Sequence, residues 1–220
     1  MFINNVFRSL SGEGLTAGLP SIFIRLNGCK WAQEGHPCVW CDTKDAWVNN
    51  QLPPIYSYEI ISRVLKIDKG ISHIVITGGE PFDQYKHVVS MCEDFLKLKF
   101  DIEIETNGSI DFVLLDLFLT KFMLAPLNIV MDIKCPSSEN ESNLRNLKIL
   151  RPQDSIKFVV QDDIDLLYVK DILINFDIKS NILISPVWGK MDSKNLAQWI
   201  IDNCPRARLS LQIHKILGIE

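Results

Sequence analysis

Short apolar runs rich in β-branched residues alternate with longer segments of helical periodicity along most of this chain. The expected strands are Ser21–Asn27, His73–Thr77, Asp101–Glu105, Asn128–Asp132, Ser155–Val160, Asn181–Ser185 and Arg208–Ile213. Apolar spacing at i, i+3 and i+4 predicts helices over Tyr58–Ile67, Phe82–Leu98, Phe112–Phe122, Asn140–Leu150, Ile164–Asn175 and Leu196–Asn203, with Asp111 and Ser193 as caps. Alternation of this kind predicts βα units and a mostly parallel sheet.

The number of units limits the architecture further. About six βα units and a closing strand are too few for a closed eight-stranded barrel, which usually needs about 250 residues. We therefore expect an α/β fold of the incomplete (βα)6-type barrel kind, rather than an open doubly wound sheet. The 220 residues form one expected domain. Residues 1–57 contain a segment that precedes the first strand (a prelude), the first strand itself and a cysteine-rich loop. Residues 58–220 contain the remaining βα units and a C-terminal segment on the substrate side.

Chemically distinctive residues come directly after the expected strands. They are Cys29–Cys41, Gly78-Gly79-Glu80-Pro81, Glu105-Thr106-Asn107-Gly108, Asp132-Ile133-Lys134, Ser185-Pro186-Val187-Trp188-Gly189 and His214-Lys215. The carboxyl ends of parallel strands are where α/β barrels carry their active sites. The placement of these segments on one rim indicates an enzyme.

Composition excludes several classes of protein. The formal net charge of -4 argues against a basic nucleic-acid-binding surface. The N-terminus does not read as a signal peptide, and no segment approaches the 18 or so apolar residues that a membrane span needs. We expect a cytoplasmic protein that contacts neither membrane nor nucleic acid directly.

Three of the six cysteines, Cys29, Cys38 and Cys41, fall within a short stretch after the first strand. Three thiolates on one loop can bind three irons of a [4Fe–4S] cluster and leave the fourth iron open for a ligand. A zinc site with His36 as fourth ligand is the alternative on spacing alone, and reactive dithiol chemistry is a weaker one. The remaining three, Cys92, Cys135 and Cys204, are expected to be buried as small apolar residues.

The cysteine motif that closes in Cys38-Val39-Trp40-Cys41, together with Thr77-Gly78-Gly79-Glu80-Pro81, resembles the radical S-adenosylmethionine (SAM) superfamily. That resemblance implies that the open iron chelates SAM, whose reductive cleavage gives a radical that abstracts hydrogen. The cofactors carry this chemistry and the protein positions them.

Further motifs narrow the resemblance to the 7-carboxy-7-deazaguanine synthase family. They are Ser9-Leu10-Ser11-Gly12-Glu13-Gly14, Gly18-Leu19-Pro20, Phe23–Cys29, Cys41-Asp42-Thr43, Glu105–Gly108, Ser185-Pro186 and Leu211–Lys215. The resemblance implies conversion of 6-carboxy-5,6,7,8-tetrahydropterin into 7-carboxy-7-deazaguanine with loss of ammonia. This product is the precursor of the deazapurines queuosine and archaeosine in tRNA. It also implies a need for Mg2+, an electron donor such as flavodoxin or ferredoxin, and a homodimer.

Matching positions give the site residues that the resemblance implies. Cys29, Cys38 and Cys41 would ligate the cluster, and Thr43 would contact magnesium. The positions around SAM are Trp40, Asp42, Gly79, Glu80, Thr106, Asn107, Lys134, Ser185, Pro186, Val187 and Trp188. Those around the pterin are Leu10, Ser11, Gly12, Glu13, Arg25, Thr77, Glu105, His214 and Glu220.

The residue types suit these roles. A carboxylate such as Glu13 or Glu105 can read the amide-like edge of a pterin, and the guanidinium of Arg25 can bind the substrate carboxylate bidentately. Glu103 and Glu105 share one strand face by their spacing of two. On their own, Arg25 could equally be a structural salt-bridged residue and His214 a buried core histidine.

Two departures from the family pattern stand out. Members of the family often have Gln where this chain has Ser11, and the eight residues between Cys29 and Cys38 exceed the usual superfamily spacing of three. Two other functions stay open at this point. One is a glycyl-radical-enzyme activase, and the other is a zinc-binding scaffold protein.

Overall fold

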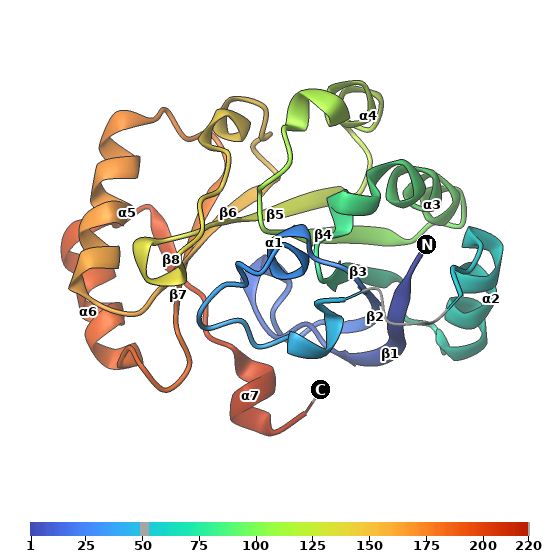
Figure 1. Ribbon diagram of the computed structural model, residues 1–220, viewed down its shortest axis with the longest axis horizontal. Coiled ribbons are helices and arrows are strands. Elements are labelled where there is room, and N and C mark those ends of the chain that lie inside the picture. The colour runs from blue at the N-terminus through green and yellow to red at the C-terminus, as the bar shows by residue number, and fades with distance from the viewer. Residues whose placement is uncertain (49–52, 220) are drawn as a thin grey trace.

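A single curved sheet forms the centre of the computed structural model, which describes residues 1–48 and 53–219 (Figure 1). Its strands follow the chain in the order β1 to β8. They are β1 Ile3–Leu10, β2 Pro20–Leu26, β3 His73–Gly78, β4 Asp101–Thr106, β5 Leu127–Ile133, β6 Ser155–Val160, β7 Asn181–Pro186 and β8 Ala207–Leu209. Every pair from β2 onward is parallel. Sequential parallel order is that of a barrel, so the expected single-domain α/β incomplete barrel is confirmed.

Strand β1 corrects the expectation of an unstructured prelude. It pairs antiparallel with β2, from Ile3 opposite Leu26 to Leu10 opposite Pro20, with an irregularity between Ile3 and Asn5. Most of its residues are only partly buried. An edge strand of this kind lacks the continuous apolar run of a buried parallel strand, and the irregular register interrupts its alternation.

Helices cover the outside of the sheet in an arc (Figure 1). The α-helices are α1 Lys30–Gln33, α2 Ser57–Ile67, α3 Tyr85–Lys97, α4 Asp116–Lys121, α5 Asp163–Asn175, α6 Ser193–Asn203 and α7 Ile213–Leu217. Short 3-10 segments are η1 Gly14–Thr16, η2 Lys44–Ala46, η3 Pro81–Gln84, η4 Phe112–Leu115, η5 Pro136–Ser138 and η6 Leu144–Lys148. Asp111 caps η4 as expected, because its carboxylate accepts from the Val113 N–H at 3.0 Å. The cap of α6 is Asp192 rather than Ser193.

The helix expected over Asn140–Leu150 is wrong, because this stretch contains only the 3-10 segment η6. Its fully buried Asn146 accepts from the Phe112 N–H at 2.8 Å and donates to the carbonyls of Gly108 and Ile110. These tertiary hydrogen bonds fix the local backbone in place of a continuing helical ladder. The apolar spacing alone did not reveal them.

The two faces of the sheet differ completely in character. On the outer face, isoleucines such as Ile24, Ile76, Ile104 and Ile156 pack against the helices in one hydrophobic core. The inner face, defined here by Arg25, Thr77, Glu103, Glu105, Asp132 and Lys157, carries charged and polar side chains that alternate with those core residues. Because strand side chains alternate between faces, the same apolar-looking runs supply both the core and a polar interior.

The side of the barrel between β8 and β1 is closed by loops rather than by strand pairing. The Gly12 carbonyl accepts from Ile213 N–H at 2.8 Å, and Gly14 N–H donates to the Ser210 hydroxyl at 3.0 Å. The last strand therefore ends at Leu209 instead of Ile213, and the chain turns into α7. These contacts bring the segment after β1 and the C-terminal helix together across the inner face.

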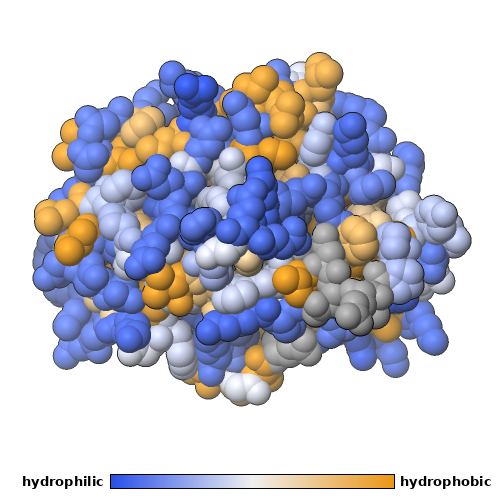
Figure 2. Space-filling view, viewed as in Figure 1, coloured by the Kyte–Doolittle hydropathy of each residue, from blue (hydrophilic) through white to orange (hydrophobic). Residues whose placement is uncertain are grey.

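The outer surface is mostly hydrophilic in the view of Figure 2, with apolar side chains along the edge where α4 lies. Exposed apolar residues in this region are Val113, Leu114, Leu117, Met123 and Leu124. Among the described residues, no helix combines the length and apolar character that crossing a bilayer requires.

Candidate active site

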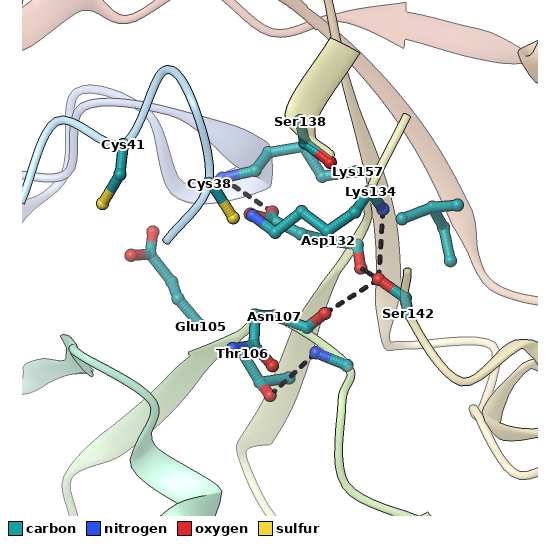
Figure 3. Close-up of polar contacts among 12 residues, drawn as sticks. Cys38, Cys41, Glu105, Thr106, Asn107, Asp132, Lys134, Ser138, Ser142 and Lys157 are labelled. Carbon is teal, nitrogen blue, oxygen red and sulfur yellow. Dashed lines mark hydrogen bonds and ion pairs between the residues drawn. The ribbon is translucent and has the colours of Figure 1, made fainter. Parts of the chain in front are cut away.

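Charged and polar side chains from five strands and two loops meet on the inner face. Strand β6 places Lys157 opposite Asp132 of β5, and β2 places Arg25 opposite Thr77 of β3. Lys157 Nζ lies 3.1 Å from Glu13 Oε2 and 3.2 Å from Asp132 Oδ1. Asp132 also accepts from Lys134 Nζ at 2.7 Å. Figure 3 shows Lys134 and Lys157 beside Asp132, with Cys38 near them.

Several residues predicted to contact substrate come together on this face. Thr77 Oγ1 donates to Glu105 Oε2 at 2.7 Å. His214 lies so close to Gly12 that a Cβ at position 12 would sit 1.8 Å from its Nδ1. Burial lowers the pKa of His214, with the Glu13 charge opposing that effect. The structure thus brings Gly12, Glu13, Thr77, Glu105 and His214 together.

Arg25 occupies the same face as these residues. Its guanidinium stacks over the ring of Phe7 at 5.2 Å from the centroid, and it is only partly buried. It also influences His214 electrostatically. Arg25 is therefore a partly exposed cation at the site rather than a member of the buried salt bridges.

The remaining residues of the predicted substrate set lie in less direct positions. Buried Ser11 shares a hydrogen bond with Thr16 at 2.8 Å and donates to the Glu13 carbonyl. Leu10 ends β1 and lines an open surface hollow of about 540 Å³ with Ile71 and Ile219. Glu220 lies outside the described residues.

Three inner-face residues were given no role at the site from the sequence: Glu103, Asp132 and Lys157. Asp132 was noted only as part of a rim segment and Glu103 only as sharing a face with Glu105, whereas Lys157 was not noted at all. Lys157 is the single charged residue in the apolar run Ser155–Val160, the same signal that singled out Arg25 in its strand. Glu103 is buried and accepts from Thr16 Oγ1 at 3.2 Å. A charged residue in the middle of a buried strand is the signal that could have found them.

These groups shift one another's pKa values. Burial, together with the neighbouring Glu105 charge, raises the pKa of Glu103 to about 8. Burial also raises the pKa of Glu105. Burial would do the same to Asp132, but Lys134 and Lys157 outweigh it and hold the Asp132 pKa below its usual value. The inner face therefore combines an ionised Asp132 with the Glu103 carboxyl group, which retains a proton near neutral pH.

The cysteine loop follows β2, and each of its three sulfurs faces one side-chain N–H donor. Asn107 Nδ2 lies 3.9 Å from Cys29 Sγ and Asn140 Nδ2 lies 3.7 Å from Cys38 Sγ. The Trp47 indole N–H donates to Cys41 Sγ at 3.1 Å. All three are free thiols and partly exposed, whereas Cys92, Cys135 and Cys204 are buried, as expected.

The chemistry of this loop fits thiolate ligands of an iron–sulfur cluster. Burial raises the pKa of Cys29 and of Cys38, so both are neutral thiols until a metal binds and displaces the proton. N–H groups aimed at sulfur stabilise cluster thiolates. In residues 1–48 and 53–219, no three His, Cys, Asp or Glu side chains are grouped as a metal site, and this holds for the three cysteines too. His36, the fourth ligand of the zinc alternative, is exposed.

The glycine-rich turn after β3 is held tightly against the cysteine loop. A Cβ on Gly79 would lie 2.0 Å from the Gly28 carbonyl oxygen, so only glycine fits. The fully buried Glu80 carboxylate accepts from Thr106 Oγ1, Asn107 N–H and Phe82 N–H at 2.7–2.8 Å. Burial raises the pKa of Glu80 to about 7. This carboxylate ties the ends of β3 and β4 together, and the backbone N–H groups of Gly79 and Glu80 donate to the carbonyls of Leu26 and Gly28.

The chain after β5 contacts the cysteine loop on its other side. The Trp40 indole N–H donates to Ser137 Oγ at 3.1 Å, and Lys134 Nζ lies 5.1 Å from the Trp40 ring centroid. Ser137 in turn donates to buried Asp165 at 2.6 Å. Of the predicted SAM positions, Trp40, Thr106, Asn107 and Lys134 therefore surround the loop.

The last predicted SAM positions lie farther around the rim. Ser185 and Pro186 form the buried end of β7, two strands from the end of β5. Val187 is also buried, and Trp188 is exposed. They share the rim with Lys134 without belonging to the group around the cysteine loop.

Asp42 and Thr43 connect the cysteine loop to the C-terminal helix. Thr43 Oγ1 donates to Asp42 Oδ1 at 3.2 Å, and Lys215 Nζ of α7 lies 2.5 Å from Asp42 Oδ2. Burial opposes ionisation, yet Lys215 outweighs it and holds the pKa of Asp42 below its usual value. The hydroxyl and carboxylate oxygens are hard ligands of the kind that Mg2+ prefers.

Known proteins share both the domain and the fold. Residues 10–152 match the 4Fe-4S single cluster domain family. A solved structure of QueE from Escherichia coli aligns with a TM-score of 0.71 at 23% identity, covering 96% of this chain and 92% of that one. Streptococcus suis SuiB aligns less fully, with a TM-score of 0.56 at 19% identity over 88% of this chain and 47% of that one.

Sequence relatives extend over nearly the full length. A 7-carboxy-7-deazaguanine synthase from Methanospirillum hungatei JF-1 is 35% identical over 100% of this chain and 86% of its own length. Another from Clostridium acetobutylicum is 37% identical over 96% of this chain and 93% of its own length. With its cysteine loop and polar inner face on a radical SAM-type barrel, the chain belongs to the 7-carboxy-7-deazaguanine synthase family.

Proposed function

We propose that this protein converts 6-carboxy-5,6,7,8-tetrahydropterin into 7-carboxy-7-deazaguanine with loss of ammonia. The observation that carries the proposal is that a group of thiols and a group of buried charged side chains lie at the same end of the barrel. Three free thiols with N–H donors lie on one side, and a buried set of carboxylates and cations lies on the other. Family membership favours this activity over a glycyl-radical-enzyme activase or a zinc scaffold.

On the cofactor side, Cys29, Cys38 and Cys41 would hold the [4Fe-4S] cluster. When bound, the cluster and SAM supply the radical chemistry that starts the ring contraction. The backbone at Gly79 and Glu80 suits the polar head of SAM, because glycine permits its close approach. Trp40, Asp42, Thr106, Asn107 and Lys134 would line the pocket, with Ser185, Pro186, Val187 and Trp188 farther along the rim.

On the substrate side, the proposed residues are those of the inner face and its closing loops. Glu13 and Glu105 offer carboxylates to the amide-like edge of the pterin, and partly exposed Arg25 suits the substrate carboxylate. Thr77 fixes Glu105 through its hydrogen bond. Leu10, Ser11, Gly12, His214 and Glu220 complete the proposed set.

Ring contraction with ammonia loss also requires proton transfer. The pKa of Glu103 is raised to about 8 by burial, so a carboxyl group that holds a proton near neutral pH is available on the inner face. The proposed Mg2+ would bind at Thr43, where Asp42 adds a second oxygen.

The wider setting follows from the same family. We propose that the product supplies queuosine or archaeosine formation in tRNA, that the protein acts in the cytoplasm, and that flavodoxin or ferredoxin reduces the cluster. The net charge of -4 agrees with an enzyme that does not hold tRNA itself. A homodimer is proposed too, and the apolar residues exposed near α4 support self-association.

The decisive experiment is anaerobic incubation of the iron-reconstituted protein with SAM, a reductant, Mg2+ and carboxytetrahydropterin. Mass spectrometry should detect 7-carboxy-7-deazaguanine and 5'-deoxyadenosine. Replacement of Cys29, Cys38 or Cys41 by Ser should abolish both products and lower the iron content, whereas Cys92→Ser should preserve iron. Cleavage of SAM without pterin conversion by the intact protein would contradict the proposed substrate.

A further inference from the structure

Lys157 is a buried cation that none of the functional assignments above uses. It comes from the middle of β6, and its side chain is almost fully buried. Its ammonium group lies between two carboxylates that belong to different parts of the site, Glu13 at 3.1 Å and Asp132 at 3.2 Å. A buried lysine in a strand otherwise made of apolar residues is costly unless it is fully paired.

The two partners of Lys157 differ in what they touch. Asp132 is also bound by Lys134, which stands over Trp40 and acts electrostatically on Cys38. Glu13 is reached from the C-terminal region by Gln212 Nε2 at 3.4 Å. Lys157 is therefore the cation shared by the cofactor side and the substrate side of the inner face.

Loss of the Lys157 ammonium would leave Glu13 without a paired cation, but it would not leave Asp132 without one. Asp132 has a second ammonium at 2.7 Å from Lys134, whereas the short-range cation on Glu13 is Lys157. Gln212 contributes only a neutral amide at 3.4 Å. Without Lys157, Glu13 would face Glu105 and Asp132 across the inner face with no compensating charge beside it.

We infer that Lys157 is a positioning residue that holds the Glu13 carboxylate aimed across the inner face, where it can accept hydrogen bonds from the substrate. The inference deepens the proposed function and rests on it for the identity of that substrate. Lys157 itself takes no part in bond breaking. Its contribution is to keep one acceptor in place among neighbouring carboxylates.

The electrostatic surroundings agree with this role. The charged or titratable groups that face Lys157 are Glu13, Asp42, Glu103, Glu105, Asp132 and Lys134, and Arg25 and His214 lie beyond Glu13. Burial would lower the pKa of Lys157, but Asp132, Glu13 and Glu105 outweigh it and raise that pKa well above its usual value. Lys157 therefore remains an ammonium throughout the physiological range.

The test is the pterin KM of Lys157→Met, measured with SAM affinity and iron content on the same preparation. We expect the KM to rise about tenfold or more, while iron content and SAM affinity stay within about threefold. The rise should be smaller at pH 6 than at pH 8, because protons replace the missing cation on the carboxylates. Lys157→Arg, which keeps the charge, should recover part of the affinity.

A matched control uses a buried ion pair that lies outside the inner face, between Arg151 and Asp154. Arg151 bonds Asp154 at 2.8 Å before the start of β6, away from the barrel mouth. Arg151→Lys should lower the melting temperature without changing the pterin KM. If Lys157→Met raises the KM no more than Arg151→Lys does, Lys157 has only a structural role and the inference is wrong.

The double variant Glu13→Gln/Lys157→Met tests the mechanism directly. With the carboxylate already removed, loss of Lys157 should change the pterin KM by less than about threefold relative to Glu13→Gln alone. An undiminished effect in that background would overturn the link to Glu13. The same double variant also serves as a control for misfolding. It lacks the Glu13 carboxylate, which Lys157→Met leaves buried without its cation.

Ligand-free melting separates this inference from the proposed function. If the wild-type protein does not bind the pterin, the proposed substrate fails, but the charge argument still makes a prediction. Lys157→Met should melt lower than the double variant, because it leaves Glu13 without its paired cation. Equal melting temperatures of the two variants would contradict the pairing of Lys157 with Glu13.

Discussion

At the scale of single residues, the carboxyl groups of the inner face differ in whether a cation is paired with them. Asp132 is paired with two lysines, whereas Glu103 is buried with only the hydroxyl of Thr16 as a hydrogen-bond donor among its described contacts. Because of that difference, the pKa of Asp132 is lowered and the pKa of Glu103 is raised. One carboxylate acts as a fixed charge, and the other keeps its proton to about pH 8.

Glu103 should make the stability of the ligand-free protein depend on pH. Its folded-state pKa of about 8 exceeds the ordinary value of 4.5, so the native state binds more protons than the unfolded state between those values. Stability should therefore fall as pH rises from about 5 to 8, by an amount on the order of a few kcal/mol. Glu103→Gln should make this slope smaller in urea-unfolding curves, and buried Glu80 and Glu105, whose pKa values are also raised, should account for what remains. An unchanged slope would show that another group is responsible.

At the scale of elements, side-chain amides replace regular helix in the connections that carry the site. Asn146 holds three backbone groups between η4 and η6, and Asn140 Nδ2 donates to the His36 carbonyl at 3.1 Å besides facing Cys38. The connection after β5 therefore binds the cysteine loop through specific hydrogen bonds rather than through apolar packing alone.

Asn146→Ala should destabilise the protein by about 2–3 kcal/mol, because it leaves the Phe112 N–H and the Ile110 carbonyl without this partner. The Gly108 carbonyl would keep only its bond from the Asn143 N–H. The measurement is the free energy of unfolding in urea. The control is Asn175→Ala on the exposed end of α5, where the amide bonds only Asp171. That change should cost less than about 0.5 kcal/mol. Similar costs for the two variants would contradict the structural importance of the Asn146 bonds.

At the scale of the whole molecule, the incomplete barrel is closed by its two terminal regions. The segment after β1 and the helix α7 meet where Gly12 contacts His214 and Ile213, and Lys215 then reaches Asp42 of the cysteine loop. Both ends of the chain therefore contribute to the mouth of the barrel.

Gly12→Ala should disturb this closure, because the added Cβ would lie 1.8 Å from His214 Nδ1. The ring must move, and we expect a loss of about 1–3 kcal/mol with faster proteolysis near the C-terminus. Limited proteolysis and thermal melting measure both effects. Gly35→Ala is the control, since no atom lies within 4 Å of its Cβ and only left-handed backbone strain remains. Equal protease sensitivity of the two variants would refute the closing contact.

The amino-acid sequence by itself determined the parallel α/β architecture, the family and the cysteine loop. Strand periodicity and short motifs are local properties, so they can be recognised in the amino-acid sequence alone. The strands from Ser21–Asn27 to Asn181–Ser185 were located to within a few residues. Strand β1 and the 3-10 segment η6 were missed, because edge pairing and the tertiary bonds of Asn146 override local pattern.

Only the tertiary structure decided which charged residues face one another. Periodicity placed Glu103 and Glu105 on one face, but strand register was needed to set Lys157 opposite Asp132 and loop closure to bring Glu13 to it. It also showed that the Glu80 carboxylate is consumed by internal hydrogen bonds. The physical reason is that electrostatic pairing depends on distances between residues far apart in the chain, and a linear pattern does not contain those distances.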